Sequence, residues 1–367
     1  MLRERMNELA RMTEVALPEM SSPSSPLFAN KVTWDGDGSR RSGVNGLYSA
    51  MSVVGLCHAS RDVRDATADL RNAILDVLCA SGHATVGERA CTLLALASCG
   101  DPRGMDQLRL LALGLDVARA SSMELGLVLA AVAAGHTGGW DQDPSIELSE
   151  AAGAELERRY VPQARVFRAT GRRSRHAADH ALTSFASQVY PIHGISELAR
   201  ATGADLPGFA VECADSLVER QGPFGQWWWL YSVRNGSIVD GYPVYSVHQH
   251  AMAFMALVSV ERAGGRSSQT ELSKGLDWVY GTNELGIPLI DEGRRTVYRC
   301  IQRVGSEADG RFGLSRGQVR RNLRTGLGLG RMPGTVVAPS ELEVLKETRP
   351  YELGWLLYAN ALLGTLD

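Results

Sequence analysis

The sequence predicts an all-α fold built from helical hairpins, and three observations support that prediction. From Gly43 onward, apolar residues recur with the period of a helix in segments of about ten to eighteen residues. Short stretches rich in Gly, Pro and Asp separate these segments, and few runs alternate like strands. Residues 189–193 (VYPIH) and 244–248 (VYSVH) resemble each other, and a helix-like run follows each of them, which indicates a repeated structural unit.

The segments amount to about a dozen helices. We expect them at 62–80, 86–99, 105–120, 122–134, 146–160, 177–189, 194–202, 207–221, 246–263, 267–280 and 351–363. Hairpins that recur at roughly fifty residues close most economically as a ring of inner and outer helices, an α/α toroid. We therefore predict one toroid domain over residues 31–367. Residues 1–30 are expected to form an N-terminal arm and a Pro/Ser-rich linker, because the prolines from Pro18 to Pro26 cannot continue a helix.

The composition of the chain argues against nucleic-acid binding and against a membrane span. The chain has 367 residues, 44% of them hydrophobic, and a net charge of −3, so it offers no electrostatic case for binding nucleic acid. The arginines between Arg303 and Arg331 are expected to form a solvated face. The N-terminus lacks the apolar core of a signal peptide, and no run is long and apolar enough to span a membrane, so we expect a soluble cytoplasmic protein.

Cysteine and histidine spacing gives no strong metal site. The six cysteines lack CxxC spacing, and we expect buried free thiols rather than a zinc site or a disulfide framework. His176 and His180 have a metal-ligand spacing, but neighbouring arginines favour a surface face. Asp35 and Asp37 are expected to serve a turn rather than calcium. We therefore expect no bound metal and no cofactor.

The segment 221–257 has the densest polar and aromatic chemistry in the chain. It holds three tryptophans, three tyrosines and two histidines, and Tyr245 and His248 stand three apart, as Tyr190 and His193 do. That spacing puts both side chains on one face of a helix. In a toroid the loops entering the inner helices lie at the barrel mouth, so both pairs are expected round one cavity. The neighbours expected to bind substrate there are Trp227, Trp228, Trp229, Tyr231, Tyr242 and His250.

A resemblance to known families rests on one hairpin, roughly residues 207–264. Residues 217–221 (LVERQ) followed by 222–228 (GPFGQWW) resemble the helix-Gln-x-x-x-Gly-x-Trp unit of α/α-barrel proteins. Two groups share this unit: the six-hairpin glycosidases with the related polysaccharide lyases, and the terpenoid cyclases. The first resemblance implies an enzyme acting on an oligosaccharide or another polyhydroxylated small molecule.

The candidate chemistry is acid–base transfer by Tyr245 and His248. In a lyase Arg349 would neutralise a uronate carboxylate, with Tyr351 and Glu352 beside it at the start of the last helix. Tyr298 and Arg299 are further candidates of the same kind. In a hydrolase Asp240 would pair with a second carboxylate. A terpenoid cyclase, with magnesium, would need Asp35/Asp37 or Asp141/Asp143 in place of the acidic motifs of that family. A non-catalytic helical-repeat binding module is the third alternative.

Overall fold

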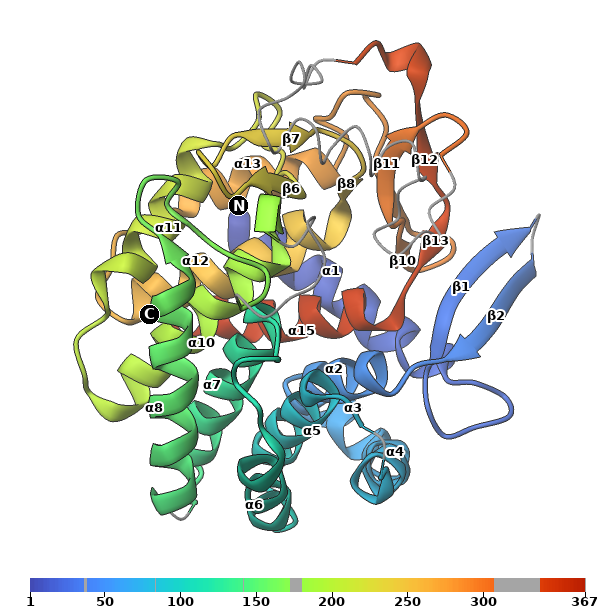
Figure 1. Cartoon of the computed structure of the whole chain (residues 1–367). Helices are drawn as coiled ribbons and strands as arrows, with labels where there is room; N and C mark the ends of the chain where they lie inside the picture. The colour runs from blue at the N-terminus through green and yellow to red at the C-terminus, as the bar shows by residue number, and fades with distance from the viewer. Residues whose placement is uncertain (36–37, 83, 141, 172–179, 307–336, 367) are drawn as a thin grey trace.

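The computed structural model describes residues 1–35, 38–82, 84–140, 142–171, 180–306 and 337–366 (Figure 1). Several sequence predictions fall wholly or partly outside these ranges. They concern the pairs Asp35/Asp37 and Asp141/Asp143, His176, and most of the arginine-rich segment that ends at Arg331.

Six helices of the described chain form a closed ring. Each packs against the next, and the last packs against the first. In order they are α2 (Gly46–Cys57), α5 (Val86–Cys99), α7 (Ser122–Thr137), α10 (Ala186–Thr202), α12 (Ala253–Arg262) with the preceding π-helix η2 (His248–Met252), and α15 (Pro350–Gly364). Their side chains are largely buried, and from Ser49 to Cys57 every residue of α2 is buried. The α/α toroid predicted from the sequence is confirmed.

A second layer of helices covers the ring. Its members pack on the outside of the ring helices. They are α1 (Leu2–Ala16), α4 (Ala68–Ala80), which follows the short α3 (Arg61–Ala66), α6 (Gly104–Gly114), α8 (Gln142–Arg159), α11 (Gly208–Glu219) and α13 (Gln269–Val279). They bury one face only, as α4 does with Ile74, Leu75 and Leu78.

Local sequence explains where several ring helices begin. Side chains of Asn45 and Thr85 accept hydrogen bonds from the first-turn backbones of α2 and α5. Ser121 and Glu124 form a reciprocal capping box at the start of α7. These caps satisfy amide groups that have no partner inside the helix.

Paired glycines set the closest contact between neighbouring ring helices. A Cβ added at Gly194 of α10 would lie 2.1 Å from the carbonyl oxygen of Gly126 in α7. A Cβ added at Gly55 of α2 would lie 2.2 Å from the carbonyl oxygen of Gly354 in α15. Any side chain at these positions would force the helices apart.

Short strands fill the connections that lead from an outer helix into the next ring helix. Three sheets have three strands each. The first contains β13 (Glu347–Thr348), β1 (Ala29–Asp35) and β2 (Gly38–Val44), and the second contains β5 (Leu182–Ser184), β6 (Leu230–Ser232) and β7 (Ile238–Asp240). The third contains β12 (Leu342–Leu345), β11 (Cys300–Arg303) and β8 (Val244–Tyr245). Two more pairs are β3 (Tyr160–Val161) with β4 (Val166–Phe167), and β9 (Ile290–Asp291) with β10 (Thr296–Val297). All pairings are antiparallel, and Figure 1 shows β1 and β2 projecting from the body. These strands therefore gather at the N-terminal ends of the ring helices, which we call the mouth.

The structure corrects three expectations. The helix α10 runs without a break through Pro191, and β5 precedes it, so the separate helices expected at 177–189 and 194–202 are wrong. The helix α1 packs against α13 and α15 and buries Met6 and Leu9, so it lies within the outer layer rather than in an arm. Cys57 and Cys99 are joined in a disulfide between α2 and α5, whereas Cys79, Cys91, Cys213 and Cys300 are free.

No helix in the described ranges combines the length and the apolar character needed to cross a membrane.

Candidate functional site

The candidate site forms where β8, η2 and the start of α15 meet at the mouth. Tyr245 ends β8 and pairs with Cys300 of β11, so that Arg299, the residue before Cys300, comes close to it. His248 begins η2, three residues further along the chain. The strand pairing therefore brings residues more than fifty positions apart into one cluster.

Three side chains surround the Tyr245 ring. The guanidinium carbon of Arg299 lies 5.0 Å from the ring centre, within cation–π range. The ring centres of His248 and Trp229 lie 5.3 and 5.8 Å away. Tyr245 is 8% exposed, and its hydroxyl forms no hydrogen bond with the described part of the chain. Burial raises the pKa of Tyr245, so the hydroxyl keeps its proton at neutral pH.

His248 has one occupied and one open ring nitrogen. Its Nδ1 lies 3.3 Å from the carbonyl oxygen of Trp227. A carbonyl can only accept, so Nδ1 carries the proton and Nε2 presents a lone pair. Nε2 has no partner among the described residues. Burial lowers the pKa of His248 to about 3, so the imidazole is neutral near pH 7 and Nε2 keeps its lone pair.

Arg299 belongs to a buried network of ion pairs. Its Nη1 donates to Glu352 Oε1 at 2.6 Å, and its Nε lies 3.6 Å from Glu347 Oε1. Glu347 also accepts from Arg349 Nε at 2.9 Å and faces Lys31 at 3.6 Å. The nearby Glu352 carboxylate helps hold the Arg299 pKa well above its ordinary value, against the effect of burial. The guanidinium is therefore a fixed cation over the Tyr245 ring.

The start of α15 contributes a second layer of contacts. Arg349 donates to the hydroxyl of Tyr48 at 3.1 Å, and Tyr351 packs on Tyr48 with ring centres 4.3 Å apart. Glu352 accepts from the backbone amide of Arg349 at 3.2 Å, which fixes the first turn of the helix. These three predicted residues lie together at the mouth, as expected, but Arg349 and Glu352 are already paired.

The other Tyr/His pair has different neighbours. Tyr190 accepts a hydrogen bond from Trp355 Nε1 at 2.7 Å. His193 Nδ1 lies 2.9 Å from Ser259 Oγ, and its Nε2 lies 3.3 Å from the hydroxyl of Tyr358. Both residues are buried between α10, α12 and α15, and both ring nitrogens of His193 are engaged. In this arrangement Tyr190 and His193 stabilise the ring, and they do not touch the Tyr245 cluster.

Most of the aromatic loop packs into the wall of the mouth. Trp227, Trp228, Tyr231 and His250 are almost completely buried, so they line the core rather than a solvent-open cavity. Tyr242 is buried too, and its hydroxyl donates to Glu284 at 2.8 Å.

Asp240 is also part of this wall. It lies 3.6 Å from Arg303 Nη2 and accepts from the amide of Tyr242 at 3.3 Å. Its carboxylate is buried. The sequence prediction therefore located the loop, and of its tryptophans Trp229 is the one against Tyr245.

Sequence analysis named Arg299 beside Arg349, but it did not single out Tyr48 and Glu347. These two residues come from α2 and β13, and no local pattern marks them. Glu347 lies two residues before Arg349, and this proximity is the sequence feature that comes closest to indicating its place in the site. Among the described residues, no group of three or more His, Cys, Asp or Glu side chains is placed to hold a metal ion.

Comparisons with known proteins agree on the architecture. No protein-family model matches the chain, and no curated protein matches its sequence. A possible member of the GH105 family from Salmonella enterica superposes with a TM-score of 0.61 at 10% identity, over 98% of this chain and 94% of that one. A sugar epimerase from a ruminal bacterium gives a TM-score of 0.61 at 8% identity, over 100% of both chains. A polysaccharide lyase gives 0.56 at 12% identity, over 99% of both.

At these identities the likeness is one of fold. The chain shares the α/α-toroid fold of these solved structures.

Proposed function

We propose that the protein is a carbohydrate-active enzyme whose Tyr245 and His248 transfer protons on an acidic saccharide, in a lyase-type elimination. The observation that carries the proposal is the open Nε2 of a neutral His248, next to a protonated Tyr245 and the Arg299 cation. Solved proteins with this fold are described as a possible member of the GH105 family, a sugar epimerase and a polysaccharide lyase, and the last two names support a saccharide as substrate.

The proposed reaction assigns one task to each side chain. His248 Nε2 removes the proton from the carbon next to the uronate carboxylate. Arg299 stabilises the negative charge that then develops on that carboxylate. The electron pair forms a carbon–carbon double bond and expels the glycosidic oxygen from the next carbon, and the Tyr245 hydroxyl gives its proton to that oxygen. Solvent then returns a proton to Tyr245 and removes one from His248.

Arg299 takes the role that the sequence had suggested for Arg349. Both arginines are paired, Arg349 with Glu347 and Tyr48 and Arg299 with Glu352 and Glu347, but Arg299 also lies against the Tyr245 ring. Trp229, edge-on to Tyr245, supplies an aromatic wall of the kind that packs against sugar rings.

The lyase version fits the site better than the hydrolase version. Hydrolysis of a glycoside usually needs two carboxyl groups, one of them free to act as an acid. Near Tyr245 both Glu347 and Glu352 are paired with arginines, and Asp240 is buried beside Arg303. An elimination requires no second carboxylate.

The test is an assay on uronate-containing polysaccharides beside neutral mannan, followed through the ultraviolet absorbance of an unsaturated uronate product. We expect activity on an acidic substrate, and a loss in kcat of about 100-fold or more in His248→Ala and in Tyr245→Phe. Arg299→Gln should lower kcat and raise KM together.

Two matched variants serve as controls. Tyr160→Phe removes a phenol on β3 that donates to Glu212, and His136→Ala removes a histidine near the far end of α7. Both should keep wild-type activity. Cleavage of a neutral glycan without an unsaturated product would instead point to a hydrolase, and equal activity in wild type and His248→Ala would refute the assignment of the base.

A further inference from the structure

The sheet of β13, β1 and β2 carries a row of side chains that begins at the Tyr245 site. Thr33 of β1 pairs with Glu347 of β13 on one side and with Arg40 of β2 on the other. Residues directly opposite each other in antiparallel strands have their side chains on the same face of the sheet. Glu347, Thr33 and Arg40 therefore form one row across three strands. The row begins at the site, because Glu347 Oε1 lies 3.6 Å from Arg299 Nε.

The two faces of this sheet have different surroundings. On one face Val32 is buried, and Trp34 lies against Tyr298 with ring centres 6.0 Å apart. That face is therefore packed against the body of the protein. The opposite face carries the row, on which Thr33 is partly buried and Arg40 is exposed. This second face is open to solvent beside the candidate site.

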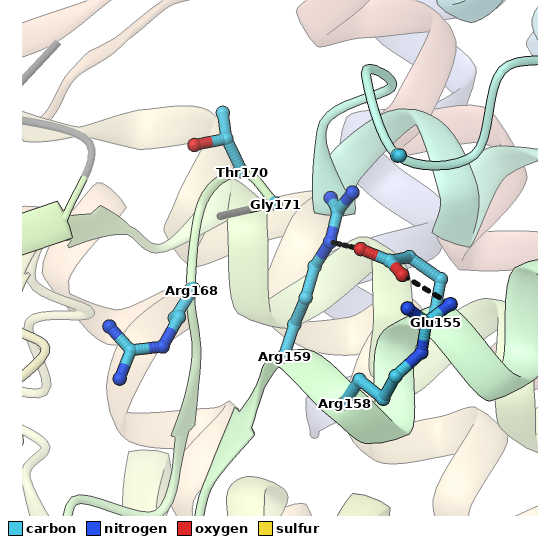
Figure 2. A pocket seen from close by; sticks show the side chains of 7 residues that line it. Glu155, Arg158, Arg159, Arg168, Thr170 and Gly171 are labelled. Carbon is cyan, nitrogen blue, oxygen red and sulfur yellow. Dashed lines mark hydrogen bonds and ion pairs between the residues drawn. The ribbon is translucent and has the colours of Figure 1, made fainter. Parts of the chain in front are cut away.

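Arg40 is the cation at the outer end of the row. Its side chain has no hydrogen bond and no ion pair with the described part of the chain. Arginines elsewhere are already paired, as Arg158 and Arg159 are, which share the carboxylate of Glu155 at the end of α8 (Figure 2). Adjacent strands lie about 4.8 Å apart, so the backbone of Arg40 lies about 10 Å from that of Glu347. An exposed guanidinium at this distance is available to an anionic group that extends outward from the site.

We propose that this face of the sheet binds a second acidic sugar of the same substrate, with Arg40 on its carboxylate while the first sugar lies at Tyr245. The inference rests on the part of the proposed function that places an acidic saccharide at the site. Two observations select this occupant: the row is continuous with the Arg299 network, and its outer end is a guanidinium, which binds carboxylates through paired hydrogen bonds. The substrate class is then a chain of consecutive uronates, because a saccharide with one acidic sugar would engage only the first position.

Calorimetric titration of the full chain tests the proposal at constant ionic strength, in the His248→Ala background so that the ligand is not turned over. The ligands are mono- and tetragalacturonate, mono- and tetraglucuronate, and neutral cellotetraose. At least one acidic tetramer should bind about fivefold more tightly than its monomer, as an exposed ion pair allows, and cellotetraose should not bind. Arg40→Gln should remove this gain without changing the binding of the monomer. Arg40→Lys, which keeps the charge, should keep most of the gain.

The matched control is Arg41→Gln, which removes the neighbouring charge of the same strand. Arg41 pairs with Val32 and so lies on the other face of the sheet, and its Nη1 donates to the carbonyl oxygen of Ser21 at 3.5 Å. This variant should keep the gain of the tetramer over the monomer. The proposal is overturned if Arg40→Gln keeps the gain, if Arg41→Gln removes it equally, or if no acidic tetramer binds more tightly than its monomer.

The binding result and the elimination assay fail separately. A gain that depends on Arg40, together with no unsaturated product from wild type, would refute the elimination and leave the second sugar position in place. Unsaturated product from wild type, with the same tetramer affinity in Arg40→Gln as in its parent, would refute the second position and leave the elimination.

Discussion

His248 and His250 lie in the same short helix, η2, but their ring nitrogens have different surroundings. His248 has Nδ1 on a carbonyl and Nε2 open, whereas His250 is fully buried and neither of its ring nitrogens has a partner in the described chain. Burial lowers the pKa of each to about 3. His248 therefore keeps one ring nitrogen open, whereas His250 is enclosed by the core.

The sequence predicted the location of these residues but could not separate their roles. The density of Trp, Tyr and His in 221–257 predicted side chains round a cavity, and in the structure most of these side chains are buried. The directions of His248 and His250 depend on η2, a π-helix whose i→i+5 bonding shifts the faces that a regular helix would present. In the loop before β6, Trp227 and Trp228 lie in the core, while Trp229 lies against Tyr245.

The buried neutral His250 should make the protein less stable in acid. In the unfolded chain a histidine takes up a proton below about pH 6.5, but in the folded chain His250 resists protonation down to about pH 3. The unfolded state therefore binds the extra proton, and the free energy of unfolding falls by roughly 1.4 kcal/mol per pH unit below 6.5. Urea unfolding at several pH values, with His250→Leu beside wild type, measures this slope.

Below pH 6.5 the free energy of unfolding of His250→Leu should fall less steeply than that of wild type, by roughly 1.4 kcal/mol per pH unit. Met252→Leu, an apolar exchange in the same π-helix, is the matched control and should keep the wild-type slope, because it changes no titratable group. An unchanged slope in His250→Leu would show that this histidine is already protonated in the folded state or accessible to water.

At the scale of elements, apolar periodicity predicted the helices well and the strands poorly. The predicted ranges for α5, α11, α13 and α15 agree with the structure within about two residues, because each has a continuous apolar face. The strands have two to seven residues, and many are too short for alternation to be recognised. The separate helices expected at 177–189 and 194–202 were wrong, because α10 continues through Pro191, although an internal proline usually breaks a helix.

The glycine contacts between α7 and α10 give a prediction at this scale. In Gly194→Ala the new methyl group would overlap the carbonyl oxygen of Gly126, so the two helices must separate. We expect a loss of about 1–3 kcal/mol in the free energy of unfolding, or more. Chemical denaturation of the purified variant gives the value.

The matched control is Gly153→Ala in α8, where an added Cβ meets nothing within 4 Å. That variant should gain about 0.5–1 kcal/mol, because alanine favours the helix. Equal effects at the two positions would contradict the close approach of α7 and α10.

At the scale of the molecule, the site depends on closure of the ring. Tyr48, Arg299 and Glu347 stand in three distant parts of the chain, and they meet because β1 pairs with β13 and because α2 packs against α15. No local pattern in a single sequence could reveal such a meeting. The toroid itself was predictable, since its hairpins repeat, but the supporting charges round Arg299 were not.

The N-terminal helix α1 is part of the outer layer of helices. Residues 1–30 were expected outside the domain, yet α1 lies against α13 and α15, and Tyr280 donates to the carbonyl oxygen of Arg5 at 3.2 Å. Met6 is 0% exposed, whereas Val15 on the same helix is 49% exposed. If α1 covers α15, these two positions must differ in their contribution to stability.

Met6→Ala should lower the free energy of unfolding by about 2–5 kcal/mol, because it leaves a cavity between α1 and the ring. Val15→Ala should change it by less than about 0.5 kcal/mol, as exposed substitutions do. Urea denaturation followed by circular dichroism measures both. A helix that behaved as a detached arm would give two small and similar values, and α15, the helix that carries Glu352, would then be stable without it.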